Sequence, residues 1–244
     1  RYYLGQVEEK KQTVDWKKVF ALYKDAAEKG SVKAQFHLST LYRMEKIQGI
    51  QNPAYNPKLA DNCLLEAAGY KHPQAQFELG LARRQVGDYE QARHWLEKSA
   101  NQGHEQAQYN VGDLLAKDKA YEAASIWYKR AAIQGHPGAK EALKGLANQD
   151  IARACFEYGR LLMMSSSPKE NDNSHHYLMK AADMGYRRAY YYRGLVHQLK
   201  VSASQSSLQS AVFYHLFDTR KDNDYLLQQL TVGIYSLKGV GLGR

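Results

Sequence analysis

The feature that most restricts the fold of this chain is a short segment that recurs along it. Glu97-Lys98-Ser99-Ala100-Asn101-Gln102-Gly103-His104 returns 32 residues later as Lys129-Arg130-Ala131-Ala132-Ile133-Gln134-Gly135-His136. Weaker copies of its small-residue core lie at residues 26–30, 67–70 and 181–185. A period of roughly 20 to 50 residues is the signature of repeat architectures, in which each unit buries its core only against its neighbours. The sequence therefore predicts a repeat array.

Two further motifs indicate that each unit contains two helices. One follows the recurring segment and begins with an alanine, which we call the motif alanine: Ala34, Ala75, Ala107, Ala154 and Ala189. The other precedes the segment, as Tyr89, Ala92 and Trp95 and again as Tyr121, Ala124 and Trp127. Such spacings place side chains on one face of an α-helix. We call the helix with the motif alanine helix A, and the helix with the aromatic motif and the recurring segment helix B.

Small residues predict how these helices end and how closely they pack. Glycines follow helix B, where a left-handed C-cap is favoured. Others lie inside helix A, at Gly80, Gly112, Gly159 and Gly194. Because glycine there costs about 1 kcal/mol relative to alanine, we expect a neighbouring helix to approach closely. The expected structural core of the repeat is Trp95, Trp127, Ala100, Ala132, Gly103 and Gly135, with both tryptophans buried between helices.

The combined pattern resembles that of the Sel-one-like repeat (SLR) family. It reads Ala-x-x-x-x-Gly in helix A, followed by Ala-x-x-Trp-x-x-x-Ala-Ala-x-x-Gly in helix B. The match is best over residues 72–136 and fair over 16–70 and 150–220. The related tetratricopeptide repeat lacks the terminal Ala-Ala-x-x-Gly. The resemblance implies an all-α fold, a right-handed α-solenoid of antiparallel helix pairs forming a tetratricopeptide-like superhelix, with helix A on the concave side. It also implies a scaffold that binds other proteins, as do bacterial enhanced-entry arrays and adaptor arrays of the endoplasmic reticulum.

The repeat rhythm divides the chain into units. We expect them at 1–30, 31–70, 71–103, 104–136, 150–185 and 186–220, with a truncated unit at 221–244. Residues 137–149 begin like helix A at Ala139, but the next motif alanine, Ala154, follows only 15 residues later. One extra helix is therefore expected there, with a change in the direction of the superhelix. Turn-forming residues predict loops at 47–57 and 164–173. Because both ends read as partial units, we expect a fragment of a longer array.

The charge of the chain permits several kinds of partner. A net charge of +9 is compatible with an acidic protein, an anionic surface or nucleic acid, or with a solvated basic surface that has no specific ligand. Helical repeats can read RNA one base at a time, so a nucleic-acid-binding repeat protein is the alternative function. Against it, polar residues do not recur at the fixed positions that such a code would need. Two cysteines, Cys63 and Cys155, make no disulfide framework and leave the compartment open, with a bacterial periplasmic or secreted location favoured over a cytoplasmic one.

Motifs that carry chemistry give no catalytic site. His72, His104 and His136 occur one per repeat, too far apart to share a metal ion, so a periodic structural role is expected. The adjacent pair His175-His176 points to different helix faces. The glycines at 239, 241 and 243 lack the strand and helix of a phosphate-binding loop. We therefore predict a non-enzymatic chain with no catalytic, cofactor-binding or metal-binding residues.

Tyrosine is unusually frequent, with 19 copies, and clusters in Tyr190-Tyr191-Tyr192. Three consecutive tyrosines on one helix cannot all face inward. Tyrosine is favoured at interfaces because its side chain is large, rigid and amphipathic. We therefore predict a protein-binding site at Tyr190, Tyr192 and Arg193, with core packing and chance clustering of these tyrosines as the alternative. The expected function is a scaffold that binds or regulates a partner protein of unknown identity through its concave face, with an enzyme of the bacterial envelope as one candidate.

Overall fold

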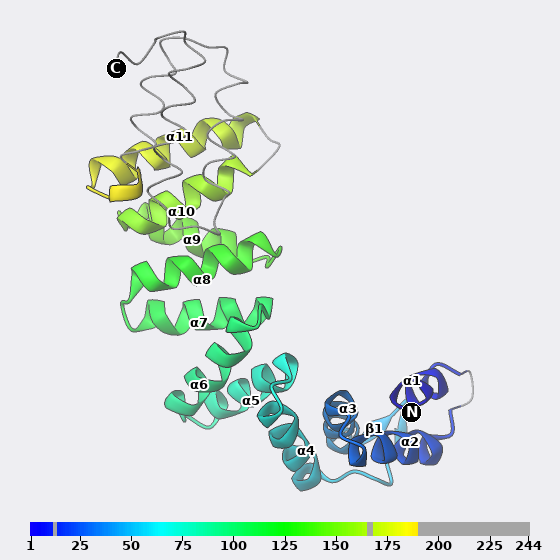
Figure 1. Ribbon diagram of the computed structural model, residues 1–244. Coiled ribbons are helices and arrows are strands. Elements are labelled where there is room, and N and C mark those ends of the chain that lie inside the picture. The colour runs from blue at the N-terminus through cyan, green and yellow to red at the C-terminus, as the bar shows by residue number, and fades with distance from the viewer. Residues whose placement is uncertain (12–13, 165–167, 190–244) are drawn as a thin grey trace, which may run out of the picture. The chain divides into compact units, whose positions relative to one another are not determined.

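The computed structural model describes residues 1–11, 14–164 and 168–189, which form eleven helices and one pair of two-residue strands (Figure 1). The all-α fold is therefore confirmed. The A helices are α1 (Tyr2–Glu9), α3 (Val32–Arg43), α5 (Pro73–Gln85), α7 (Glu105–Lys117) and α10 (Ala152–Met163). The B helices are α2 (Trp16–Glu28), α4 (Pro57–Gly69), α6 (Tyr89–Asn101), α8 (Tyr121–Ile133) and α11 (Pro168–Asp183), and the remaining helix is α9 (Ala139–Asn148). None of these helices combines the length and apolar character that a membrane span requires.

The chain divides into two compact units, Arg1–Ala142 and Leu143–Arg244. In the first unit, the helices from α1 to α7 each pack against the next, and α7 packs against α8. In the second unit, α10 packs against α11. The motif alanine is fully buried in every described A helix that contains it, which confirms that this position faces the core: Ala34, Ala75, Ala107 and Ala154.

The close approach predicted at the interior glycines is present. A Cβ added at Gly80 would lie 2.7 Å from Cγ of Leu96, and one added at Gly112 would lie 2.7 Å from two ring carbons of Tyr128. Gly159 meets Leu178 at the same distance. The opposing residue always stands three positions before the small pair of helix B. Glycine is therefore required because a large side chain of helix B presses against the backbone of helix A.

That large side chain is not the predicted tryptophan. Leu96 and Tyr128 are 0% and 4% exposed, whereas Trp95 and Trp127, one residue earlier, are only half-buried. Trp95 packs against the edge of the core, with Nζ of Lys98 4.5 Å from its ring centre. The expectation of two buried tryptophans was wrong because consecutive residues on a helix point about 100° apart. The next residue, not the tryptophan, lies at the centre of the buried stripe.

Helix B ends as the small residues predict. Gly103 and Gly135 have φ values of +89° and +98°, so both are left-handed C-cap residues. At the same place after α4, Lys71 adopts φ +62°. Ala100 is buried, and Ala132 is half-buried beside the fully buried Ala131.

Buried glutamines add a hydrogen-bond ladder between repeats. Nε2 of Gln76 donates to the carbonyl of Ala68 in the preceding helix B, and its Oε1 accepts from Gln102 at 2.7 Å. Gln108 repeats both bonds, with Ala100 at 3.2 Å and Gln134 at 2.8 Å. A glutamine directly after the motif alanine therefore links its helix A to the ends of the two flanking B helices, and its own buried amide is hydrogen-bonded.

Helix α9 combines the start of a helix A with the end of a helix B. Its first residue, Ala139, is buried like a motif alanine and follows His136 as Ala107 follows His104. Its last turn has Ala147, whose carbonyl accepts a hydrogen bond from Sγ of Cys155 at 3.2 Å, just as Ala100 accepts one from Gln108. The hairpin between the two halves is missing, which explains why the motif alanines are only 15 residues apart here.

The two predicted loops have different outcomes. Between α3 and α4, β1 (Lys46–Ile47) and β2 (Ile50–Gln51) form a small antiparallel hairpin, which the all-α prediction did not include. Gln48 and Gly49 both have positive φ, as a tight hairpin turn requires. Nδ2 of the buried Asn52 donates hydrogen bonds to the carbonyls of Leu41 and Met44, which connects the loop to the end of α3. Of the loop predicted at 164–173, residues 168–173 belong instead to α11, which begins at Pro168, a favoured first helical residue.

Candidate protein-binding surface

The A helices of the first unit present one side to the core and the other to solvent. Side chains three residues after the motif alanine are only partly buried. Positions one before and six after it turn to the same side of the helix. Together with Arg43 and Arg84, which both stand nine residues after the motif alanine, these positions form what we call the A-helix surface. Its residues lie on α3, α5 and α7: Lys33, His37, Thr40, Arg43, Gln74, Glu78, Leu81, Arg84, Gln106, Asn110 and Asp113.

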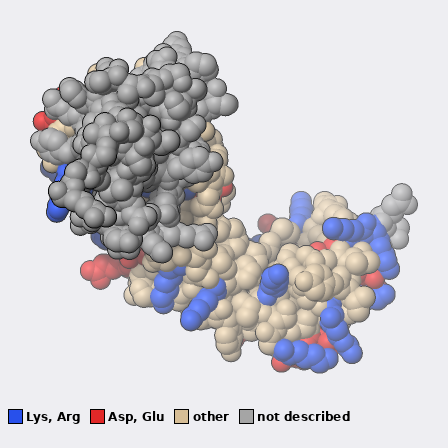
Figure 2. Space-filling view, turned by 45° about the horizontal axis from the view of Figure 1, so that its top comes forward, with Lys and Arg blue, Asp and Glu red and all other residues tan. Residues whose placement is uncertain are grey.

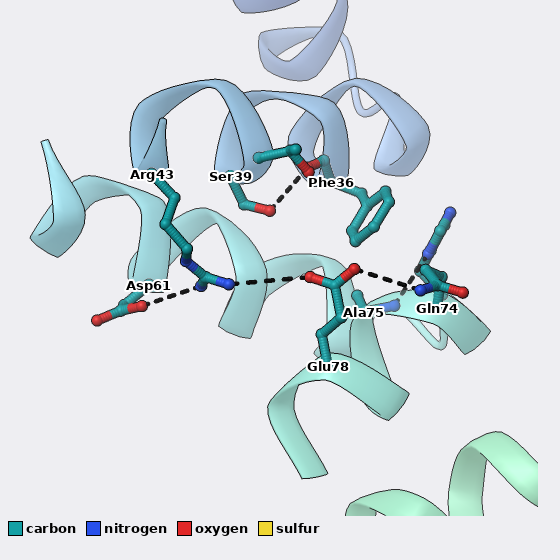
Figure 3. A network of polar contacts seen from close by, with 9 residues as sticks. Phe36, Ser39, Arg43, Asp61, Gln74, Ala75 and Glu78 are labelled. Carbon is teal, nitrogen blue, oxygen red and sulfur yellow. Dashed lines mark hydrogen bonds and ion pairs between the residues drawn. The ribbon is translucent and has the colours of Figure 1, made fainter. Parts of the chain in front are cut away.

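A polar network joins α3, α4 and α5 on this surface (Figure 3). The guanidinium of Arg43 lies 3.1 Å from Oδ1 of Asp61 and 3.9 Å from Oε2 of Glu78. Gln74 donates to Glu78 at 3.3 Å, and its own Oε1 lies 2.6 Å from Nε2 of His104 at the start of α7. Exposed ion pairs contribute little to stability, typically about 0–1 kcal/mol. The main effect of the network is to hold the side chains of three successive A helices in a defined arrangement.

A second contact continues this arrangement toward α7. Nη1 of Arg84 donates to Oδ1 of Asn110 at 2.8 Å. On the same helix, Oδ1 of Asp113 accepts a hydrogen bond from the hydroxyl of Tyr128 at 2.8 Å. Burial, together with this bond, raises the pKa of Tyr128 above its ordinary value, so the residue stays a neutral donor. Arg84 and Asp113 thus each make a side-chain hydrogen bond on the surface.

The periodic histidines have the structural role expected of them. His72 stacks on Phe36, His104 on Phe77, and His136 on Tyr109, with ring centres 4.8, 4.7 and 4.2 Å apart. Each ring therefore contacts an aromatic residue of the preceding helix A. Across residues 1–11, 14–164 and 168–189, no group of three or more potential ligands is arranged to hold a metal ion.

Lysine and arginine side chains gather over the N-terminal helices, as Figure 2 shows.

On α1, three large apolar side chains are exposed: Tyr3 at 71%, Leu4 at 58% and Val7 at 60%. Tyr3 precedes Gly5 by two residues, as Tyr192 precedes Gly194, so the two tyrosines hold the same position in their repeats. The predicted site residues Tyr190, Tyr192 and Arg193 themselves lie outside the described residues.

The site residues predicted from the sequence did not include Arg43, Glu78, Arg84 or Asn110. A signal for them was present, because Glu78 and Asn110 both stand three residues after the motif alanine, and Arg43 and Arg84 both stand nine after it. Aligning the polar positions of successive A helices, in addition to the small and aromatic ones, would have placed these four side chains on one surface.

Comparison with known proteins gives similar solved structures, while no protein-family model and no curated protein matches the chain. A Sel1 repeat protein from Oxalobacter formigenes is 31% identical over 50% of this chain and 95% of its own, with a TM-score of 0.44. A protective antigen with an SLR fold from uropathogenic Escherichia coli is 21% identical over 100% of this chain and 57% of its own, with a TM-score of 0.49. An immunity protein from Pseudomonas aeruginosa is 20% identical over 77% of this chain and 80% of its own, with a TM-score of 0.41.

Proposed function

Since the chain belongs to the Sel1-like repeat family, we propose that it is a non-catalytic scaffold that binds a partner protein through the A-helix surface. Solenoids bury their core between repeats and leave an extended face of equivalent helices open to a partner. In this chain the open face of the first unit is the A-helix surface.

The observation that carries the proposal is that side chains of successive A helices fix one another. Arg43 of α3 reaches Glu78 of α5, and Arg84 of α5 reaches Asn110 of α7. A surface whose side chains are already held in place loses less conformational entropy when a partner binds. Arginine is also among the residues most enriched at protein interfaces. This arrangement favours a polar protein surface as the ligand.

A second contact region is proposed at Tyr190, Tyr192 and Arg193. Its support is the sequence alone, together with the exposure of Tyr3 at the equivalent position of α1. We expect the partner to be a bacterial protein, and an enzyme of the cell envelope is the first candidate, because the bacterial arrays that the sequence resembles are binding scaffolds.

The test is capture of partners from a bacterial lysate with the full chain, followed by mass spectrometry. The surface variant is Arg84→Ala with Asn110→Ala. The control variant is Glu90→Ala with Glu122→Ala, which removes two exposed carboxylates from the first turns of α6 and α8. We expect the surface variant to lose at least tenfold in affinity for the captured protein and the control to keep it, with equal helix content in both.

Two results would contradict the proposal. One is an equal effect of the surface and control variants, which would place binding elsewhere. The other is capture that is abolished by nuclease and falls steeply with salt, which is the behaviour of a nucleic-acid-binding protein.

A further inference from the structure

Two histidines link successive repeats in a way that depends on their protonation state. Nδ1 of His72 accepts a hydrogen bond from the amide of Ala75 at 3.3 Å, and Nδ1 of His104 accepts one from the amide of Ala107 at 3.2 Å. Each imidazole is therefore the N-cap of an A helix. Because each ring also stacks on an aromatic residue of the preceding A helix, it joins two repeats as well as starting one.

Only the neutral imidazole can do this. A ring nitrogen that accepts a hydrogen bond has no proton, and in the imidazolium both nitrogens are donors. For His104, Nε2 lies 2.6 Å from Oε1 of Gln74, which fits the neutral tautomer with its proton on Nε2. At the start of α3, Ser31 caps the amide of Ala34 with its hydroxyl at 3.4 Å, and serine does not titrate in this range.

We propose that the starts of α5 and α7 form a pH-responsive element, in which protonation of His72 and His104 releases both caps and loosens the contact between successive repeats. The junction at Ser31 stays unchanged. The element belongs to the array itself, so it is independent of whether the A-helix surface binds a protein.

The surroundings of the two rings decide where this occurs. Burial lowers the pKa of His72 below its ordinary value, and the nearby His37 and Lys33 lower it further. Burial also lowers the pKa of His104, while Glu105 acts in the opposite direction. Both rings are therefore neutral near pH 7, and both gain their proton only under acidic conditions.

His136 is a natural exception within the same series. It stacks on Tyr109, but the amide of Ala139 donates to the backbone carbonyl of His136 at 3.2 Å, and no side-chain cap is formed. Its Nδ1 is buried without a hydrogen-bond partner. The element therefore comprises His72 and His104 and does not extend to α9.

Amide hydrogen exchange of the full chain, measured by NMR at pH 7.5 and pH 5.0, tests the proposal at the capped residues. The quantity is the protection factor of Ala75 and Ala107, which corrects for intrinsic exchange at each pH, divided by that of Ala34, which removes changes in stability common to all three helix starts. Loss of a cap worth about 1 kcal/mol corresponds to about fivefold less protection at the acidic pH. The nitrogen shifts of the imidazoles should show an unprotonated Nδ1 at pH 7.5.

Asparagine variants separate titration from packing. Asparagine is a strong N-cap that does not titrate, so His72→Asn should make the relative protection of Ala75 independent of pH while Ala107 still responds. His104→Asn should give the converse. Equal pH dependence of Ala34, Ala75 and Ala107 in the wild type would overturn the proposal, as would an Nδ1 that is protonated in the neutral ring. The exchange and nitrogen-shift measurements on the wild type need no variant, so the proposal can be refuted even if the asparagine variants fold poorly.

Discussion

Replacing Gly112 with alanine should destabilise the array, although alanine is the better helix former. The new Cβ would lie 2.7 Å from both Cδ1 and Cε1 of Tyr128, which is closer than carbon atoms can approach. The ring of Tyr128 cannot easily move away, because the residue is 4% exposed and its hydroxyl donates a hydrogen bond to Asp113 at 2.8 Å. Overpacking of this kind costs about 1–3 kcal/mol, and the helix propensity of alanine returns up to about 1 kcal/mol. We expect a net loss of about 1–2 kcal/mol.

A matched control isolates the steric part of this loss. Gly145 lies inside α9, and nothing lies within 4 Å of a Cβ built on it. Gly145→Ala should therefore gain only the propensity term and stabilise the protein by about 0.5–1 kcal/mol. Because both variants gain the same propensity, the difference between them measures the contact with Tyr128.

Thermal unfolding followed by far-ultraviolet circular dichroism is a suitable assay. For a chain of this size, about 1 kcal/mol corresponds to about 2–4 °C in Tm, so Gly112→Ala should melt about 2–8 °C below the wild type. Gly145→Ala should melt at or slightly above the wild-type temperature. If Gly112→Ala is as stable as Gly145→Ala, the contact between helix A and the large residue of helix B does not restrict the repeat, and the argument for the interior glycines is refuted.

The remaining predictions concern the histidines, a tryptophan and a buried glutamine. Because burial lowers the pKa of His72 and His104 in the folded state, the unfolded chain binds more protons below about pH 6.5, so the free energy of unfolding should fall as the pH drops below that value. Urea unfolding between pH 7.5 and 5.0 measures this, and the double asparagine variant should lose less than the wild type over that range. Trp127→Ala should lower the free energy of unfolding by less than the roughly 3–5 kcal/mol expected for a fully buried tryptophan, because the ring is half-buried under the guanidinium of Arg130. A loss within that range would contradict the position of Trp127 at the edge of the core. Gln108→Leu should cost about 1–3 kcal/mol in chemical denaturation, because one buried hydrogen bond, to Ala100, and one partly buried hydrogen bond, from Gln134, are lost. A variant as stable as the wild type would show that the glutamine ladder is dispensable.

Features set by local chemistry could be predicted from the sequence. Positive φ at Gly103 and Gly135 follows from the need for a left-handed residue at the end of a helix, which glycine meets without strain. The burial of the motif alanines follows from their recurrence once per repeat at the same place in helix A. The family resemblance depended on the same recurring positions, which is why it was visible without a structure.

The candidate surface was less predictable. Arg43 and Glu78 are 35 residues apart in the sequence, and only the packing of α3 beside α5 brings them within 3.9 Å. Within a single helix nothing distinguishes them from other charged residues on solvent-exposed faces, and only the alignment of successive repeats shows that they hold recurring positions. The site that the sequence did suggest, at Tyr190, Tyr192 and Arg193, stays a prediction.

The sequence by itself determined that the chain is an array of helix pairs and which positions repeat. The tertiary structure decided which of two adjacent residues faces the core, Leu96 in place of Trp95, and that α9 joins half of one helix to half of another. The physical reason is that periodicity gives the spacing of an apolar stripe, whereas the rotation of a helix about its own axis is set by its neighbours. Here the backbone at Gly80 leaves room for one large side chain of the facing helix, and the contact selects Leu96 to fill it.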